Sequence, residues 1–171
     1  PGWRRGDGFH MRLGRPQEDL PGVFQGIGLV GQLGRVFFLR LGPGQQANAA
    51  QAATRAPDAV FQTAQGAAVR LADYKGKVVL VDFWASWCTP CKTSFPALDS
   101  LSREYRERGV EVLAVNLDER RRDADAFLAA HPHTLTVLFD PTGAAPLAFK
   151  VQGMPSSFVV DRTGHVRFIL R

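Results

Sequence analysis

Two cysteines are the residues of this chain best suited to chemistry. Cys88 and Cys91 are the only cysteines in the 171 residues, and Thr89 and Pro90 separate them. If a helix begins here, its backbone N–H groups and its dipole favour the thiolate form of Cys88 over the thiol. Helical spacing then brings Cys91 beside Cys88, where it can resolve a mixed disulfide. We interpret the pair as a redox-active dithiol in which Cys88 attacks and Cys91 resolves.

Other uses of the two cysteines are less well supported. They could be small buried apolar residues, or they could bind a metal ion together with His131 and His133. The run His131-Pro132-His133 has no recognised spacing of metal ligands, and four histidines with two cysteines leave little for a structural zinc site. We therefore expect neither a metal nor a cofactor.

Composition and the remaining motifs exclude several classes of function. A chain that is 45% hydrophobic and 22% charged is globular, not disordered throughout or collagen-like. The formal net charge is +5, but residues 1–57 carry +4 of it, so the rest lacks the basic patch of a nucleic-acid-binding protein. No histidine is near Ser94, Ser156 or Ser157 for a hydrolase triad. No glycine-rich loop follows a strand and opens a helix, so a nucleotide site is not supported.

The segments on either side of the cysteines have clear patterns. Lys77 to Trp84 is a nearly continuous apolar run rich in β-branched and aromatic residues, which predicts a strand buried on both faces. From Cys88 to Arg108, apolar residues recur every three or four positions, which predicts a helix that ends at Gly109. Pro90 falls in its first turn, where the missing N–H costs nothing, and Pro96 should kink it.

Further elements follow along the chain. Extended segments are predicted at 58–63, 67–71, 110–117, 135–139, 157–160 and 166–170, helices at 120–130 and 143–149, and turns at 73–76 and 161–164. Strands that alternate with helices predict an α/β fold with a central mixed sheet flanked by helices.

Residues 1–57 differ from the rest of the chain. They show no sustained period of 2 or 3.6, and basic residues precede a mildly apolar stretch, Leu20 to Leu41, and a small-residue run at 47–50. This order is that of a secretory signal, although glycines and two arginines interrupt the apolar part. We interpret residues 1–57 as a leader, either a degraded export signal or anchor or a disordered segment, and residues 58–171 as the domain.

The motif around the cysteines resembles a known family. Val81 to Cys91 (VDFWASWCTPC) resembles the signature of the thioredoxin superfamily, and Met154 to Phe158 (MPSSF) resembles its cis-proline loop. Pro96 matches the superfamily's helix kink. The resemblance spans about residues 58–171 and implies a thioredoxin-like fold and a thiol–disulfide oxidoreductase. The chain ends directly after its last predicted strand, so the superfamily's closing helix is expected to be missing.

Two features favour the TlpA/ResA-like branch. Residues 57–77 resemble its N-terminal hairpin, and residues 120–139 resemble the helix–strand unit that it inserts. That branch implies extracytoplasmic reduction of protein disulfides, as in cytochrome c maturation. The implied partners are a disulfide-containing protein and a membrane or soluble thiol electron donor, without nucleic acid, and the protein is expected to be a monomer. The alternatives are a cytosolic general thioredoxin, a peroxidase of related fold, or a non-catalytic module. The peroxidase is less well supported, because no Thr lies three residues before a Cys as it does in such peroxidases.

Asp82 departs from the branch in an instructive way. The branch commonly has a glutamate where this chain has Ser94, and an asparagine where this chain has Asp82. In having an aspartate at the second position, this chain is similar to thioredoxins. Burial in an apolar strand would raise the pKa of Asp82 and suit it to take a proton from Cys91. The alternative is a solvated, idle acid at a strand edge.

The remaining site residues are expected to bind substrate. Trp87 would shield the disulfide and, with Thr89 and Pro90, offer a surface to partners. The resemblance implies that Met154 contacts Cys88, although it could serve packing alone. It also implies that the backbone beside Pro155 receives the substrate chain by strand-like pairing.

Overall fold

The computed structural model describes residues 10–14, 27–30 and 36–40 as backbone and residues 54–171 with their side chains. The first three ranges are β1 (His10–Gly14), β2 (Ile27–Val30) and β3 (Val36–Arg40), which form an antiparallel sheet in the order β1-β3-β2. The sequence predicted no strand here, because residues 1–57 show no sustained alternation of apolar and polar residues. The division between leader and domain at residue 57 stays a prediction.

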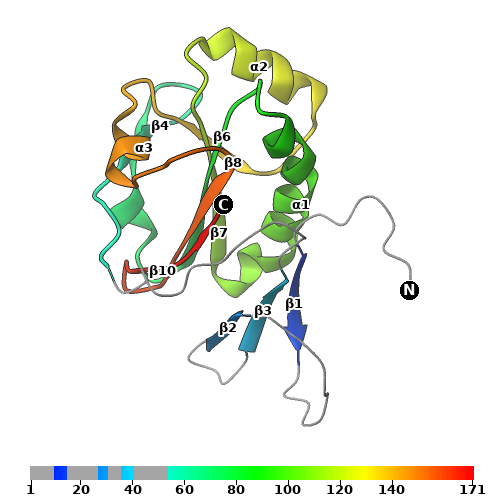
Figure 1. Ribbon diagram of the computed structural model, residues 1–171, viewed down its shortest axis with the longest axis vertical. Helices are drawn as coiled ribbons and strands as arrows, with labels where there is room; N and C mark the ends of the chain where they lie inside the picture. Colours follow the sequence, from blue (N-terminus) through cyan, green and yellow to red (C-terminus); the bar gives the residue numbers. More distant parts are fainter. Residues whose placement is uncertain (1–9, 15–26, 31–35, 41–53) are drawn as a thin grey trace.

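A seven-stranded mixed sheet forms the centre of the described domain (Figure 1). Its order is β10-β9-β6-β7-β8-β4-β5, and β6, β7 and β8 are parallel to one another while each other neighbouring pair is antiparallel. The strands are β4 (Val60–Gln62), β5 (Ala68–Arg70), β6 (Val78–Trp84), β7 (Val110–Asn116), β8 (Thr136–Phe139), β9 (Ser156–Val160) and β10 (Val166–Leu170).

Helices cover both faces of this sheet. The helices are α1 (Thr89–Tyr105), α2 (Arg121–Ala130) and α3 (Ala144–Ala148), with 3₁₀ turns at Leu71–Tyr74 and Arg106–Arg108. In Figure 1, α1 and α3 lie on opposite sides of the strands. The predicted elements of residues 58–171 agree with these to within a few residues, except that a 3₁₀ helix overlaps the predicted turn at 73–76. None of the helices in the described ranges is long and apolar enough to cross a bilayer.

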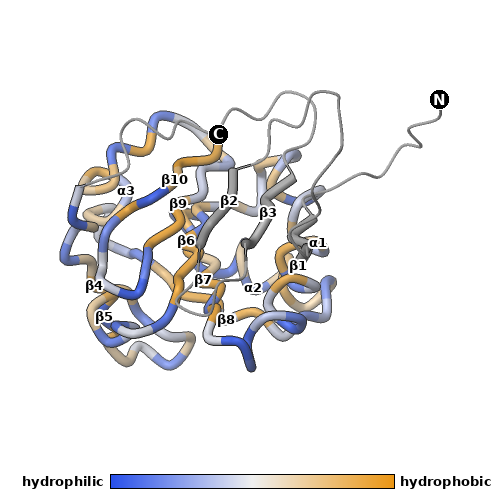
Figure 2. The backbone as a smooth tube through the Cα atoms, turned by 90° about the horizontal axis from the view of Figure 1, so that it is seen from below, coloured by the Kyte–Doolittle hydropathy of each residue, from blue (hydrophilic) through white to orange (hydrophobic). Residues whose placement is uncertain are grey.

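Alternation along the strands separates two apolar cores. Leu80 and Trp84 of β6 pack with α1 and α2 on one face, which we call the α1 face. Val81 and Phe83 pack with α3 and the 3₁₀ helix at 71–74 on the other face. The central strands are accordingly the hydrophobic part of the backbone in Figure 2. Because both faces are covered, β6 is buried along almost its whole length, as its unbroken apolar run predicted.

The last residues of the predicted leader are attached to the domain. The N–H of Val166 donates to the carbonyl of Thr54 (3.0 Å), and that of Ala56 donates to the carbonyl of Gly164 (2.9 Å). Ala56 is buried in the core opposite α1. Residues 54–56 therefore extend the edge of the sheet next to β10.

Candidate active site

The two cysteines form a disulfide at the start of α1. Their sulfur atoms are 2.02 Å apart and their Cα atoms 5.3 Å apart. Cys88 is the N-cap of the helix, and the N–H of Cys91 donates to Cys88 Sγ at 3.2 Å. A donor aimed at this sulfur stabilises the negative charge of a thiolate there, so the geometry suits Cys88 to attack once the pair is reduced.

Both cysteines are buried in this oxidised state. Cys88 is 4% exposed and Cys91 is 1% exposed, and both belong to the apolar cluster on the α1 face. The two residues are thus almost equally buried. The assignment of Cys88 as the attacking residue therefore rests on its position at the helix start.

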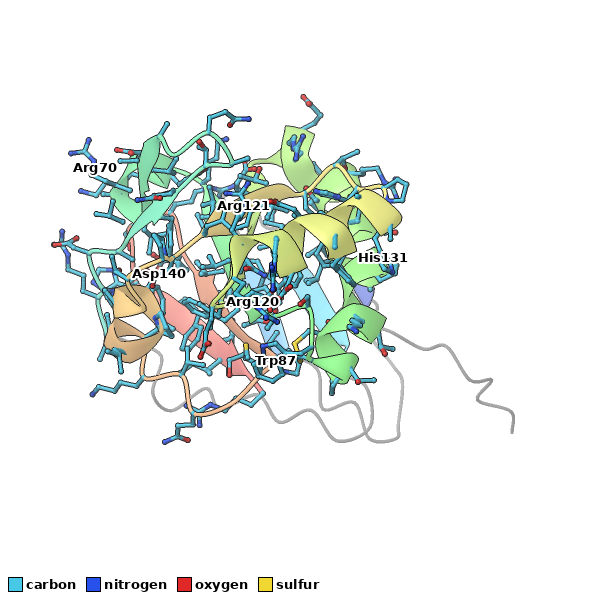
Figure 3. All side chains as sticks on the ribbon, turned by 90° about the horizontal axis from the view of Figure 1, so that it is seen from above. Arg70, Trp87, Arg120, Arg121, His131 and Asp140 are labelled. Atoms are coloured by element: carbon cyan, nitrogen blue, oxygen red, sulfur yellow. A yellow bond between two sulfur atoms is a disulfide. The ribbon has the colours of Figure 1, made fainter. Side chains whose placement is uncertain are left out.

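Exposed residues surround the start of α1. Trp87 is 67% exposed, and Thr89 and Pro90 are exposed as well. In Figure 3, Trp87 lies at the periphery of the molecule beside the first turn of α1. The indole of Trp87 is thus accessible beside the disulfide, and its contact with partners stays a prediction.

The Met154–Pro155 loop has the form that the resemblance implied. The peptide bond between Met154 and Pro155 is cis. Met154 packs against the cluster that contains both cysteines, and Ser156 Oγ donates to the carbonyl of Gly153 at 2.7 Å. The loop therefore lies near the disulfide, while the substrate-binding roles of Met154 and Pro155 remain predictions.

Asp82 is a buried carboxylic acid on the same face as the cysteines. It lies two residues from both Leu80 and Trp84 on β6, so it shares their face, and it is 2% exposed. Oδ1 accepts a hydrogen bond from Ser157 Oγ (2.5 Å), and Oδ2 has no partner within the described part of the chain. Burial raises the pKa of Asp82 to about 7, partly opposed by the bond from Ser157. Asp82 is therefore not solvated, as the alternative from the sequence required, and its role as a base stays a prediction.

Two groups of site residues were not singled out from the sequence. One is Ser157, for which the sequence indicates only that it lacks the nearby histidine of a hydrolase triad. The other is Asp118, which accepts bonds from the N–H and hydroxyl of Ser86 and from the side chain of Asn116. Asn116 and Asp118 lie where β7 ends, next to the loop that leads to Cys88. A polar pair directly after a buried parallel strand was the available signal.

Other residues weighed from the sequence have structural roles. Ser94 Oγ donates to the carbonyl of Cys91 (3.0 Å). The ring of His131 stacks on Phe127, and the ring of His133 meets Phe95 edge to face. No three His, Cys, Asp or Glu side chains of the described ranges come together in an arrangement that could hold a metal.

The helix start at residues 120–122 bears ion pairs. Arg120 Nε bonds to Asp123 at 2.8 Å, and Arg121 Nε bonds to Asp125 at 2.7 Å. Figure 3 shows Arg120 and Arg121 at the start of α2, and Asp140 beside α3. Arg120, Arg121 and Arg122 thus form a partly paired surface.

Comparisons with known proteins point to one family. Residues 52–169 match the AhpC/TSA family. The chain is 35% identical over 115 residues to the thiol-disulfide oxidoreductase ResA of Geobacillus kaustophilus. The aligned residues make up 67% of this chain and 66% of that relative, which is just under two thirds of its length.

Solved structures agree with this match. A Chlorobium tepidum protein assigned as the thiol:disulfide interchange protein DsbE is 45% identical, with a TM-score of 0.66 over 69% of this chain and 83% of that one. The thioredoxin domain of a Bacteroides vulgatus thiol-disulfide oxidoreductase is 24% identical, with a TM-score of 0.65 over 69% and 86%, and so shows likeness of fold. The predicted thioredoxin-like fold and the resemblance to ResA-like proteins are confirmed.

Proposed function

Because the chain belongs to the AhpC/TSA family and carries its two cysteines as a disulfide at a helix start, we propose that it is a thiol–disulfide oxidoreductase that reduces protein disulfides. The observation that carries this proposal is the N–H of Cys91 aimed at Cys88 Sγ. This bond gives the first cysteine a stabilised thiolate and the second a position from which it can resolve the product.

In the proposed cycle, the thiolate of Cys88 attacks one sulfur of a substrate disulfide. The substrate S–S bond breaks, a mixed disulfide with Cys88 forms, and the departing sulfur takes up a proton. Cys91 then loses its proton and attacks the Cys88 sulfur, which releases the second substrate thiol. The substrate has gained two electrons, and the enzyme keeps the Cys88–Cys91 disulfide until a thiol donor reduces it.

Asp82 is the proposed acceptor of the Cys91 proton. Cys91 is 1% exposed, so bulk water is a poor acceptor for its proton. Asp82 is buried on the same face of the sheet, and its pKa of about 7 leaves a substantial fraction of the carboxylate deprotonated near neutral pH. A base with a pKa close to the working pH is an efficient general base.

Substrate binding is proposed for the surface around Cys88. Trp87, Thr89 and Pro90 supply its exposed side chains. The cis-proline loop at Met154–Pro155 supplies backbone that can pair with an extended substrate chain. A protein substrate would thus be held by an indole surface and by main-chain hydrogen bonds, which suits a reductase that serves more than one sequence.

The substrate class and location follow from the resemblance to TlpA/ResA-like proteins. We infer that the protein works outside the cytoplasm as a monomer, keeps cysteines such as those of apocytochrome c reduced, and receives electrons from a membrane or soluble thiol donor. The 35% identity to a protein named ResA supports this inference. One observation favours a general cytosolic thioredoxin instead, namely Asp82 at the position where thioredoxins have an aspartate. Fractionation of cells that make the protein distinguishes the two.

Reduction of a protein disulfide tests the proposed activity. With dithiothreitol as electron donor, the protein should accelerate the reduction of insulin, and Cys88→Ser should abolish the acceleration. Ser102→Ala, a change of a buried residue on α1 away from the disulfide, should keep it. Absence of turnover in the folded wild-type protein, together with rapid consumption of hydrogen peroxide, would support a peroxidase instead.

A further inference from the structure

One hydroxyl group links the buried acid to the surface beside the cis-proline loop. Asp82 and Ser157 are directly opposite each other in the register of β6 and β9, and Ser157 Oγ donates to Asp82 Oδ1 at 2.5 Å. Asp82 is 2% exposed, whereas Ser157 is half-buried and follows Pro155 by two residues. The hydrogen bond therefore joins the core of the site to the place proposed for the substrate chain.

The neighbouring strands bring no charge to this position. Across β7, the residue opposite Asp82 is Ala114. Glu111 lies three residues before Ala114, so its side chain is on the opposite face of β7. There, Lys77 and Thr136 donate hydrogen bonds to its carboxylate. On β9, Ser157 itself is the polar residue that faces Asp82.

The helices over this face bring two thiols, the buried phenol of Tyr105 and one fully engaged carboxylate. Cys88 and Cys91 lie in the α1-face cluster and titrate once they are reduced. The carboxylate of Asp99 on α1 bonds to Thr134 and to Arg103. From α2, Ala124 and Phe127 are the residues buried in the same cluster.

We propose that Ser157 is a positioning residue for the resolving step: its hydroxyl holds Oδ1 of Asp82 and leaves Oδ2 as the atom that takes the proton of Cys91. The proposal rests on the role of Asp82 given above. Its support is the pairing of the two residues across the strands and the contrast between the two carboxyl oxygens. Within the described residues, Oδ1 has a partner and the buried Oδ2 has none.

The hydroxyl also sets the pH range in which Asp82 can act. Burial favours the neutral acid, while a hydrogen bond donated to the carboxylate favours its charged form. These two influences leave the pKa of Asp82 at about 7. Loss of the Ser157 hydroxyl leaves burial unopposed, so the pKa rises and Asp82 becomes a base only at higher pH.

Three variants isolate this effect. Ser157→Ala removes the hydroxyl, and Ser157→Thr keeps it on a side chain suited to a strand. Ser102→Ala removes a different buried hydroxyl, one that accepts a bond from Arg106 rather than donating to a carboxylate. Ser102→Ala thus controls for the general effect of losing a hydroxyl from this core.

Two measurements are made on each variant. The first is a ¹³C NMR titration of the Asp82 carboxyl group in the oxidised protein, in which neither cysteine titrates. The second is the pH profile of mixed-disulfide decay, measured by rapid mixing of the reduced protein with a disulfide-containing peptide. We expect both midpoints to move up by about one pH unit in Ser157→Ala. Neither should move in Ser157→Thr or Ser102→Ala.

The outcomes separate this proposal from the proposed function. An unchanged carboxyl midpoint in Ser157→Ala overturns the role of Ser157, whatever Asp82 does. The role of Ser157 is also overturned if the carboxyl midpoint moves but the decay profile stays unchanged. In that case the Asp82→Asn variant shows whether the role of Ser157 or that of Asp82 is wrong. Slow decay in Asp82→Asn means that Asp82 is still the base and Ser157 does not control it. Decay as fast as in the wild type means that the proposed role of Asp82 fails.

Discussion

At the scale of single residues, the burial that suits Asp82 to act as a base also lowers the stability of the folded protein when the carboxylate is charged. A carboxylic acid that is 2% exposed loses the hydration of its charged form, and one hydroxyl restores only part of it. Proteins commonly hold such groups where chemistry needs a base near neutral pH. The cost predicts how the stability of the protein depends on pH.

We predict that Asp82→Asn is more stable than the wild type at pH 8 and that this advantage disappears toward pH 4. The pKa of Asp82 is about 7 in the folded protein against an ordinary 3.8, so the native state binds the extra proton between these values. Wild-type stability at this site is therefore full below about pH 4, falls as the pH rises toward 7, and then levels off. The difference should reach a few kcal/mol.

Urea denaturation of the oxidised proteins at pH 4, 5.5, 7 and 8 measures this difference. Asp125→Asn is a suitable control, because Asp125 is exposed and its bond is to Arg121 on the surface. A gap between Asp82→Asn and the wild type that stays constant over the whole range would contradict the raised pKa.

At the scale of elements, the active-site loop depends on the strand beside it. Asp118, just after β7, accepts hydrogen bonds from the N–H and the hydroxyl of Ser86, at 2.9 to 3.2 Å. Ser86 lies two residues before Cys88, between β6 and α1. The carboxylate thus connects the end of one parallel strand to the loop that follows its neighbour.

We predict that Asp118→Ala lowers the free energy of unfolding by about 1–3 kcal/mol and slows the attack of Cys88 on a substrate disulfide. Removing the carboxylate leaves the Ser86 donors without their acceptor and lets the loop move. Glu119→Ala, a change of the exposed neighbouring residue, should have little effect on either quantity. Equal behaviour of the two variants in denaturation and in stopped-flow exchange would show that the loop does not need Asp118.

The same scale shows what the sequence can and cannot predict. β6 and α1 were predictable, because a buried run and an apolar stripe are local patterns. The bond between Asp82 and Ser157 was not, since it joins residues 75 positions apart and requires that β9, rather than another strand, pair with β6. The burial of Asp82 was predictable from its apolar strand, but its partner depended on the sheet order.

At the scale of the whole molecule, the described contacts of residues 54–56 bear on the leader. These residues pair with the edge of the sheet at 164–166, and Ala56 is buried. The two functional cysteines, Asp82 and the cis-proline loop all lie after them. The fold is therefore expected to need the pairing segment, and the chemistry is expected not to need the residues before it.

We predict that deletion of residues 1–50 leaves insulin reduction unchanged, while deletion of residues 1–57 lowers stability by about 1–3 kcal/mol. The longer deletion removes the two backbone hydrogen bonds to β10 and its turn, together with the buried Ala56. Turnover and urea denaturation of both truncated proteins measure this. A large loss of turnover after the shorter deletion, with the fold retained, would show that the leader belongs to the active unit.

Trapping of the mixed disulfide tests the central claim most directly. Reduced Cys91→Ser protein is mixed with a disulfide-containing protein, the adduct is isolated without reductant, and the linked peptides are identified by mass spectrometry. Attack by Cys88 predicts a stable adduct joined through Cys88, and none with Cys88→Ser. A folded Cys91→Ser protein that forms no adduct, or a Cys88→Ser protein that forms one through Cys91, would contradict the assignment of Cys88 as the attacking residue.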